Sequence, residues 1–235
     1  MTTPTFEPDL AGLSERIGYS FEDEPLLRRA MAHRSWCAEV TGQVSNERLE
    51  FLGDAVLGWV IADIAYRRHQ ELPEGKLTDL RKSVVNANAL AAVAEDIELG
   101  SHLLLGRGED LAGGRHKASI LSDALEAVIG AVYLDGGVGA AIDLIDRLFT
   151  EPLVVAAARL DRLDYKTLLQ EISARLYDVA PVYVLSDSGP DHQKHFVATA
   201  FVAGRPLGSG EGRSKKVAEQ GAAEQACMVL QAESD

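Results

Sequence analysis

Five carboxylates lie at helical spacing within two apolar stretches of the chain. Glu47, Glu50 and Asp54 follow one another at steps of three and four residues, so a helix would place all three on one narrow face. Asp123 and Glu126 form a second pair, three residues apart, among apolar or small neighbours. Like charges at this spacing repel one another. A carboxylate cluster in a partly buried helix therefore requires a compensating cation, which is Arg, Lys or a metal ion.

The two acidic stretches predict a metal site if their helices pack side by side. Four side chains would then converge on one point, and we call them the carboxylate quartet: Glu50, Asp54, Asp123 and Glu126. Oxygen ligands without Cys or His favour a hard ion, so we expect Mg²⁺, with Mn²⁺ as a possible substitute. Such an ion bridges carboxylates to substrate phosphates and activates water, which is the chemistry of phosphodiester hydrolysis.

The spacing leaves other interpretations of these acids open. Acidic pairs at helical spacing usually belong to a solvated helix face. Alternatively, Arg48, Lys117 or Arg81 could neutralise the acids in structural salt bridges. A calcium site is not indicated, because no ligand loop of that kind occurs in the sequence. Spacing alone does not distinguish the metal site from the salt bridges.

A second group of polar residues lies in the last third of the chain. Ser214 is expected to cap a helix that begins with Lys215 and Lys216, and a helix N-terminus favours phosphate. Amides and a loop histidine can reach 2′-hydroxyls in the wide RNA minor groove, while lysines hold phosphates. A solvated surface is the alternative for the lysine pair. The other predicted RNA contacts, on an earlier helix and a turn, are Gln170, Glu171, His192 and Lys194.

Composition restricts the class of protein. The 235 residues allow one large or two small domains, and 46% hydrophobic with 25% charged residues is typical of a soluble globular protein. No secretory signal or membrane-spanning run is recognised, and the two cysteines fit a reducing cytoplasm. The net charge of −13 argues against nucleic-acid binding unless basic residues gather on one face, as Lys215 and Lys216 do in sequence.

The secondary-structure pattern changes along the chain and predicts two domains. Residues 6–153 have helical patterning almost throughout and predict an all-α domain. Residues 154–163 are predicted to be a linker. Residues 164–233 then predict a small α+β domain with the order α-β-β-β-α, because two β-branched and aromatic runs lie between helical segments.

Within the helical domain, some positions carry more specific expectations. A helix is predicted from Asn46 to about His69, and a later one is stopped by residues 135–137, Asp-Gly-Gly. Residues 36–45 are predicted to be a polar loop. Gly53 and Gly58 cost the first helix about 1 kcal/mol each in propensity, so we expect another helix or chain to approach closely there.

His33 lies beside Arg34-Ser35 and near Trp36. We expect a buried, hydrogen-bonded histidine rather than a catalytic one, because nothing nearby in the sequence completes a triad.

The sequence resembles the ribonuclease III family over nearly its whole length. Residues 46–54, NERLEFLGD, resemble the signature motif of the family, and residues 117–137 resemble its second motif. The C-terminal segment, with GPDHQKHF at 189–196 and SKKVAE at 214–219, is similar to a double-stranded-RNA-binding domain. The resemblance implies an endoribonuclease that cuts both strands of duplex RNA and leaves 5′-phosphate and 3′-hydroxyl ends.

The resemblance also implies roles for individual residues. The four metal-binding carboxylates of the family match the carboxylate quartet, with Asp54 and Glu126 as the catalytic pair. Family members dimerise through the helical domain and form one catalytic valley with two sites. Two further acidic positions of the cleft match Glu47 and Glu74, and a residue that packs across the homodimer interface matches Phe51.

A competing hypothesis is a non-catalytic binder of double-stranded RNA that uses its helical domain only to dimerise. The intact carboxylate quartet argues against it, because a binder has no need to keep four repelling carboxylates. We therefore expect a cytoplasmic enzyme that processes precursors of ribosomal and messenger RNA, has double-stranded RNA as its partner and does not bind membranes.

Overall fold

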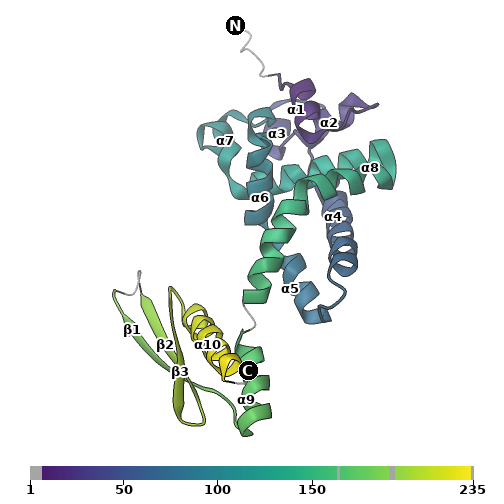
Figure 1. Ribbon diagram of the computed structural model, residues 1–235. Helices are drawn as coiled ribbons and strands as arrows, with labels where there is room; N and C mark the ends of the chain where they lie inside the picture. Colours follow the sequence, from purple (N-terminus) through teal and green to yellow (C-terminus); the bar gives the residue numbers. More distant parts are fainter. Residues whose placement is uncertain (1–6, 163–164, 191–193, 234–235) are drawn as a thin grey trace. The chain divides into compact units, whose positions relative to one another are not determined.

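The protein consists of two compact units, Met1–Ala156 and Ala157–Asp235, in a computed structural model that describes residues 7–162, 165–190 and 194–233. The predicted fold class is confirmed: a helical unit is followed by a small α+β unit (Figure 1). Helix α8 continues to Arg162, so most of the predicted linker is helical. The domain bounds 6–153 and 164–233 stay predictions.

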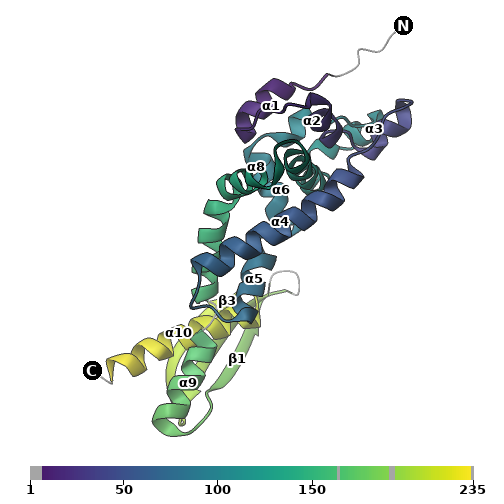
Figure 2. The same ribbon diagram turned by 90° about the vertical axis from the view of Figure 1, so that its right-hand side faces the viewer.

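The first unit is built from helices, with one isolated parallel bridge between Ala32 and Leu104 among its described residues. Helix α4 (Glu47–Arg68) crosses the first half of α8 (Ala118–Arg162), as Figures 1 and 2 show. The other helices of this unit are α1 (Leu10–Ile17), α2 (Glu24–Ala30), α3 (Arg34–Glu39), α5 (Glu74–Val84), α6 (Ala87–Asp96), η1 (Leu99–His102), α7 (Arg107–Leu111) and η2 (Gly114–His116).

Two glycines set the distance between α4 and α8. A Cβ atom at Gly53 would lie 1.7 Å from the carbonyl oxygen of Glu126, and one at Gly130 would lie 2.3 Å from that of Leu49. The two helices therefore touch backbone to backbone at this crossing. The close approach predicted at Gly53 is confirmed, whereas a Cβ at Gly58 would meet nothing within 4 Å.

Helix α8 is bent where the sequence predicts a stop. Gly137 has φ 75° and ψ −170°, which is outside the helical region and is readily adopted only by glycine. Just before it, the carboxylate of Asp135 accepts hydrogen bonds from the hydroxyl of Tyr19 (2.7 Å) and the backbone N–H groups of Glu22 and Asp23 (3.0 and 2.8 Å). The bend thus anchors the segment between α1 and α2.

The apolar character of α8 comes from the core that it forms. By length and composition, residues 118–158 could cross a membrane, and they are the only such helix among the described residues. Leu125, Val128, Ile129 and Val132 are fully buried within the first unit, however, against helices such as α4. A buried core helix can have the same length and apolar composition as a membrane-spanning helix.

One predicted loop is partly wrong. Residues 36–39 of the expected loop 36–45 belong to α3, whereas residues 40–45 form neither helix nor strand. The helix forms because His33 occupies its N-cap position and the ring accepts a hydrogen bond from the backbone N–H of Ser35 (3.3 Å). Histidine is an uncommon cap, so the start of this helix was missed.

The second unit is a three-stranded antiparallel sheet with two helices on one face (Figures 1 and 2). The strand order is β1-β2-β3, with Thr199 opposite both Val184 and Ser209. Ala200, Ala222 and other buried side chains form its core. The elements are α9 (Tyr165–Tyr177), β1 (Val182–Ser188), β2 (His195–Val202), β3 (Arg205–Gly212) and α10 (Lys215–Ala232).

Candidate metal centre and RNA-binding surface

The crossing of α4 and α8 brings three carboxylates of the quartet together. Glu50 from α4 and Asp123 and Glu126 from α8 each offer one oxygen, and these oxygens lie within 4.8 Å of one another. All three residues are half-buried. The contact of Gly53 with the backbone of Glu126 explains the convergence. Glu50 lies one turn before Gly53 on α4, so this contact brings its carboxylate close to those of α8.

Asp54, the fourth member, lies at the edge of this cluster. It is exposed, and its oxygens are not among those within 4.8 Å of one another. Its negative charge nevertheless contributes to raising the pKa values of both Glu126 and Glu50, as expected of a residue one turn along α4 from Glu50. The structure therefore joins three quartet members closely and places the fourth beside them.

The pKa values show that the negative charge of the cluster is not balanced. Burial, followed by the charges of Asp54, Asp123 and Glu50, raises the pKa of Glu126 from 4.5 to about 7. Burial and then the charges of Asp123, Glu47 and Asp54 also raise the pKa of Glu50. Desolvation and like charges both disfavour the ionised carboxylate, so each group would gain from a nearby cation.

No protein cation supplies that charge within the described residues. Neither Lys nor Arg forms an ion pair with a member of the quartet there. Lys117 pairs instead with Glu109, and Arg48 and Arg81 are exposed. The salt-bridge alternative is therefore not found in this part of the chain. A set of carboxylate oxygens without Cys or His fits a hard divalent ion.

The two further acidic residues lie outside the cluster. Glu47 is exposed, accepts a hydrogen bond from the hydroxyl of Ser45 (2.6 Å) and lies 3.8 Å from a guanidinium nitrogen of Arg34. Glu74 is also exposed, in the first turn of α5, and accepts a hydrogen bond from the hydroxyl of Thr78 (3.0 Å). Of these two, only Glu47 acts electrostatically on Glu50.

Phe51 follows Glu50 on α4, and 80% of it is exposed. Trp59 (51%) and Tyr66 (71%) of the same helix are exposed as well, and large apolar side chains gathered on a surface mark interaction sites.

The predicted RNA contacts of the second unit begin at the N-terminus of α10. The hydroxyl of Ser214 accepts a hydrogen bond from the backbone N–H of Val217 (3.3 Å), so this residue caps the helix as predicted. Lys215 and Lys216 occupy the first turn and are exposed. Both lysines are therefore positioned at a helix end that already favours phosphate.

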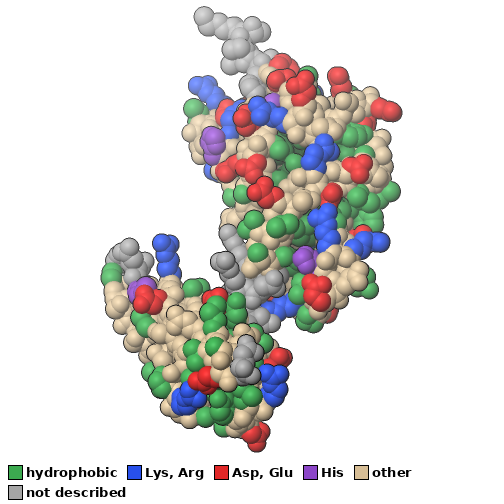
Figure 3. Space-filling view, in the orientation of Figure 1, with side chains coloured by type: hydrophobic (Ala, Val, Ile, Leu, Met, Phe, Trp, Pro, Cys, Tyr) green, Lys and Arg blue, Asp and Glu red, His purple; other side chains and the backbone are tan. Residues whose placement is uncertain are grey.

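The remaining predicted contacts come from other elements of the second unit. Gln170 and Glu171 are exposed on α9. Lys194 is half-buried just before β2, and its ammonium lies 3.5 Å from a carboxylate oxygen of Asp187. His192 lies outside the described residues. On the face of this unit that Figure 3 presents, charged side chains are few and scattered among hydrophobic and uncharged polar ones.

An ion pair that the sequence analysis missed joins α9 to α10. The ammonium of Lys166 lies 2.6 Å from a carboxylate oxygen of Glu219 and 4.8 Å from the ring centroid of Tyr183. The two charged residues are 53 positions apart, so no local spacing could reveal the pair. Gly130 was missed as a packing position too, although a small residue inside an apolar helix is a signal for close approach.

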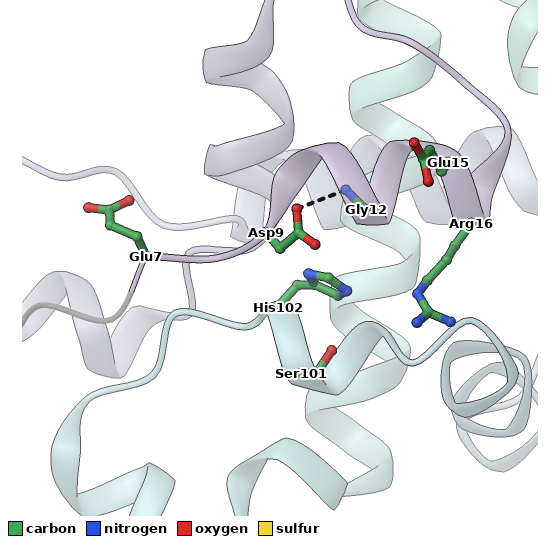
Figure 4. A pocket seen from close by; sticks show the side chains of 7 residues that line it. All are labelled: Glu7, Asp9, Gly12, Glu15, Arg16, Ser101 and His102. Carbon is green, nitrogen blue, oxygen red and sulfur yellow. Dashed lines mark hydrogen bonds between the residues drawn. The ribbon is translucent and has the colours of Figure 1, made fainter.

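A separate hollow of about 740 Å³ lies between α1 and η1 and contains no quartet residue (Figure 4). Several of its polar groups are already paired: Asp9 accepts a hydrogen bond from the N–H of Gly12 (2.9 Å), and Arg16 forms an ion pair with Glu98 (2.8 Å). His102 is buried, and its pKa is lowered by burial. These contacts fasten the N-terminal segment to η1 and do not resemble the carboxylate cluster.

Comparison with known proteins gives a family match for each unit. Residues 23–153 match the Ribonuclease-III-like family, and residues 165–230 match the double-stranded RNA binding motif. Ribonuclease 3 of Streptomyces coelicolor is 54% identical over 224 residues, which are 95% of this chain and 80% of the relative. Ribonuclease 3 of Thermobifida fusca is 50% identical over 236 residues, 100% of this chain and 98% of the relative.

A solved structure resembles the helical unit. The nuclease domain of the Campylobacter jejuni ribonuclease III aligns with a TM-score of 0.57 and 38% identity, over 61% of this chain and 97% of that domain. That structure was described for flexibility in a region involved in dimer formation. Together with the full-length relatives, these matches show that the chain belongs to the ribonuclease III family and is an endoribonuclease acting on double-stranded RNA, with an acidic cluster compatible with metal binding.

Proposed function

We propose that the carboxylate quartet binds Mg²⁺, with Mn²⁺ as a substitute, and that the enzyme leaves 5′-phosphate and 3′-hydroxyl ends. The observation that carries this proposal is the unbalanced charge of the cluster. Three carboxylate oxygens lie within 4.8 Å of one another, and none of these groups is paired with Lys or Arg in the described part of the chain. A bound divalent ion supplies positive charge at the phosphate and lowers the pKa of a coordinated water.

Each quartet residue is proposed to have its own part in binding the ion. Glu126 is the most strongly perturbed member, and its pKa of about 7 means that its proton must leave before the carboxylate can coordinate. Asp54, being exposed, is the member best placed to meet both the ion and an arriving phosphate. Glu50 and Asp123 complete the ligand set from the two sides of the crossing. Glu47 and Glu74 are proposed to line the same cleft.

The second unit is proposed to hold the duplex. Lys215 and Lys216 would bind phosphates at the start of α10, where the helix dipole adds to their charge. Minor-groove contacts would come from α9 and from the turn before β2. The residues assigned to these contacts, together with the capping Ser214, are Gln170, Glu171, His192 and Lys194.

A cleavage assay on uniform duplex RNA tests the metal site. Glu126→Gln keeps the size of the side chain but removes the charge, so it should abolish cleavage in Mg²⁺ while duplex binding stays within about twofold of wild type. Glu95→Gln, an exposed acid on α6, is the matched control and should cleave normally. Normal cleavage by the Glu126 variant would contradict the assignment. End-labelled products digested with a 5′-phosphate-dependent exonuclease test the end chemistry.

We further propose that two copies associate through the helical unit with Phe51 at the interface. Phe51→Asp should convert the dimer to a monomer, because a buried charge without a partner is strongly unfavourable. Leu111→Asp is a close control, since Leu111 on α7 is also 80% exposed. Sedimentation velocity should report a monomer for the first variant only. A wild-type chain that sediments as a monomer would end this proposal.

The cellular role follows the chemistry of the substrate. Duplex segments of ribosomal and messenger RNA precursors are the proposed substrates, in the cytoplasm. Sequencing of 5′ ends from cells with and without the Glu126→Gln variant should show processing sites that depend on an intact quartet.

A further inference from the structure

Among residues 7–162, 165–190 and 194–233, one ring nitrogen of His33 forms hydrogen bonds and the other forms none. Its Nδ1 atom lies 2.8 Å from Oγ of Ser35 and accepts from the backbone N–H of the same residue at 3.3 Å. The N–H of Gly106 donates to Oγ of Ser35 (2.9 Å), which leaves the hydroxyl hydrogen to point at Nδ1. A nitrogen that accepts from both groups carries no hydrogen, so the neutral ring has its hydrogen on Nε2.

The backbone around His33 is tied to the helix that carries Glu50. The N–H of His33 donates to the carbonyl of Leu104 (3.1 Å), and the carbonyl of the preceding Ala32 accepts from the N–H of Asn46 (2.9 Å). Asn46 directly precedes α4, and its buried side chain also donates to the carbonyl of Ala30 (3.1 Å). His33 therefore keeps a fixed place beside the start of the first acidic helix.

The charged groups that act on the ring come from four helices, two of which carry the quartet. They are Glu109 on α7, Arg34 on α3, Asp123 on α8 and Glu47 on α4. Asp123 is itself a member of the quartet. Burial nonetheless lowers the pKa of His33, so the neutral ring is favoured despite these acids. The result is a half-buried ring that favours its neutral form and lies close enough to Asp123 of the quartet to be influenced by its charge.

Within the described residues, Nε2 of His33 has no hydrogen-bond partner. Solvent reaches this nitrogen, because the buried side-chain nitrogen or oxygen without a partner in the described part of the chain is the hydroxyl of Tyr183. A substrate oxygen that replaces this water keeps the donor satisfied. The backbone of an RNA duplex offers phosphate oxygens as acceptors for such a donor. We propose that Nε2–H of His33 donates a hydrogen bond to a phosphate oxygen beside the scissile bond, and that Ser35 and Gly106 hold the ring in the orientation this requires.

This inference rests on the proposed metal site, and it makes His33 a substrate-contacting residue. A merely structural role, as cap of α3, predicts something different. Asparagine can replace the capping acceptor, because its Oδ1 matches Nδ1, but it has no donor at the position of Nε2. Glutamine reaches the position of Nε2 with an N–H donor but is a poor cap.

The cleavage rates and melting temperatures of the two variants therefore distinguish a substrate contact from a helix cap. If His33 contacts the RNA, His33→Asn should lower the single-turnover cleavage rate in Mg²⁺ about 10- to 100-fold, as when one donor to a reacting phosphate is lost. Its melting temperature should stay near that of wild type. His33→Gln should melt at a lower temperature but retain more of the cleavage rate. Duplex affinity, measured in the Glu126→Gln background, should be unchanged by either.

Two outcomes would overturn the proposal. A His33→Asn enzyme that cleaves like wild type, or a His33→Gln enzyme that is both less stable and slower than the Asn variant, would leave His33 as a cap only. The proposed metal site is judged separately by Glu126→Gln. If that variant cleaves normally, the metal site fails; if it is inactive and His33→Asn is fully active, only the His33 contact fails.

Discussion

The two units hold the charges of their proposed sites in opposite ways. In the first unit, Glu50 and Glu126 are half-buried at a crossing where the helix backbones touch, and their pKa values are raised. In the second unit, Lys215 and Lys216 are exposed in the first turn of a helix. Catalytic groups must keep a fixed geometry around an ion, whereas phosphate-binding lysines can adjust to a helical backbone. Changes in packing should therefore affect cleavage at the first site most, and changes in salt concentration should affect RNA affinity at the second.

The largest expected effect comes from breaking the helix crossing. Gly53→Ala would place a Cβ atom 1.7 Å from a backbone oxygen of α8, and a backbone cannot move aside as a flexible side chain can. We expect the free energy of unfolding to fall by about 3 kcal/mol or more, the upper range for overpacking. Cleavage should be lost as well, because Glu50 and Glu126 would move apart.

Gly58→Ala is the matched control for this change. The same substitution five residues along α4 meets nothing within 4 Å and should stabilise the helix by up to about 1 kcal/mol. Urea unfolding gives the stability of both variants, and a cleavage assay gives their activity. Equal effects of the two substitutions would mean that the crossing does not depend on Gly53.

A smaller effect is expected from removing charge in the second unit. Lys215→Ala with Lys216→Ala should lower duplex affinity about 10-fold and reduce the slope of log affinity against log salt by about 1 to 2, since each lost phosphate contact removes slightly less than one. The single-turnover rate at saturating RNA should be unchanged. Arg175→Ala, an exposed change on α9, is the control. An unchanged salt slope would remove the two lysines from the RNA contact.

The contrast between the units also explains what could be predicted from the sequence. The carboxylates stand in long helical segments, so their shared faces follow from the helical period, and Ser214 follows from the chemistry of capping. The packing of Gly130 against the backbone of α4 and the pair Lys166–Glu219 depend on segments far apart in the chain. A glycine inside an apolar helix signals a close approach, but no local pattern tells which distant segment approaches it, so only the folded structure reveals the partners.

The smallest expected effect concerns the ion pair between α9 and α10. Glu219→Gln should lower the stability of the second unit by about 1 kcal/mol, because the side chain of Glu219 is only 19% exposed and Lys166 would lose its partner. Glu233→Gln breaks a more exposed pair with Arg205 and should cost close to nothing. Thermal unfolding of the two variants would show whether the loss of stability depends on the burial of the ion pair or only on its presence. Equal losses would mean that burial has no influence.

The central claim is that the quartet carries unbalanced charge that a divalent ion neutralises, and the titration of Glu126 tests it most directly. Because its pKa is raised from 4.5 to about 7, protonation stabilises the folded state below about pH 4.5, and this stability is lost as pH rises through 7 in metal-free protein. Carboxyl-carbon NMR, assigned with Glu126→Gln, should give a pKa near 7 without metal and a much lower pKa in Mg²⁺. A pKa near 4.5 that does not respond to Mg²⁺ would contradict the account.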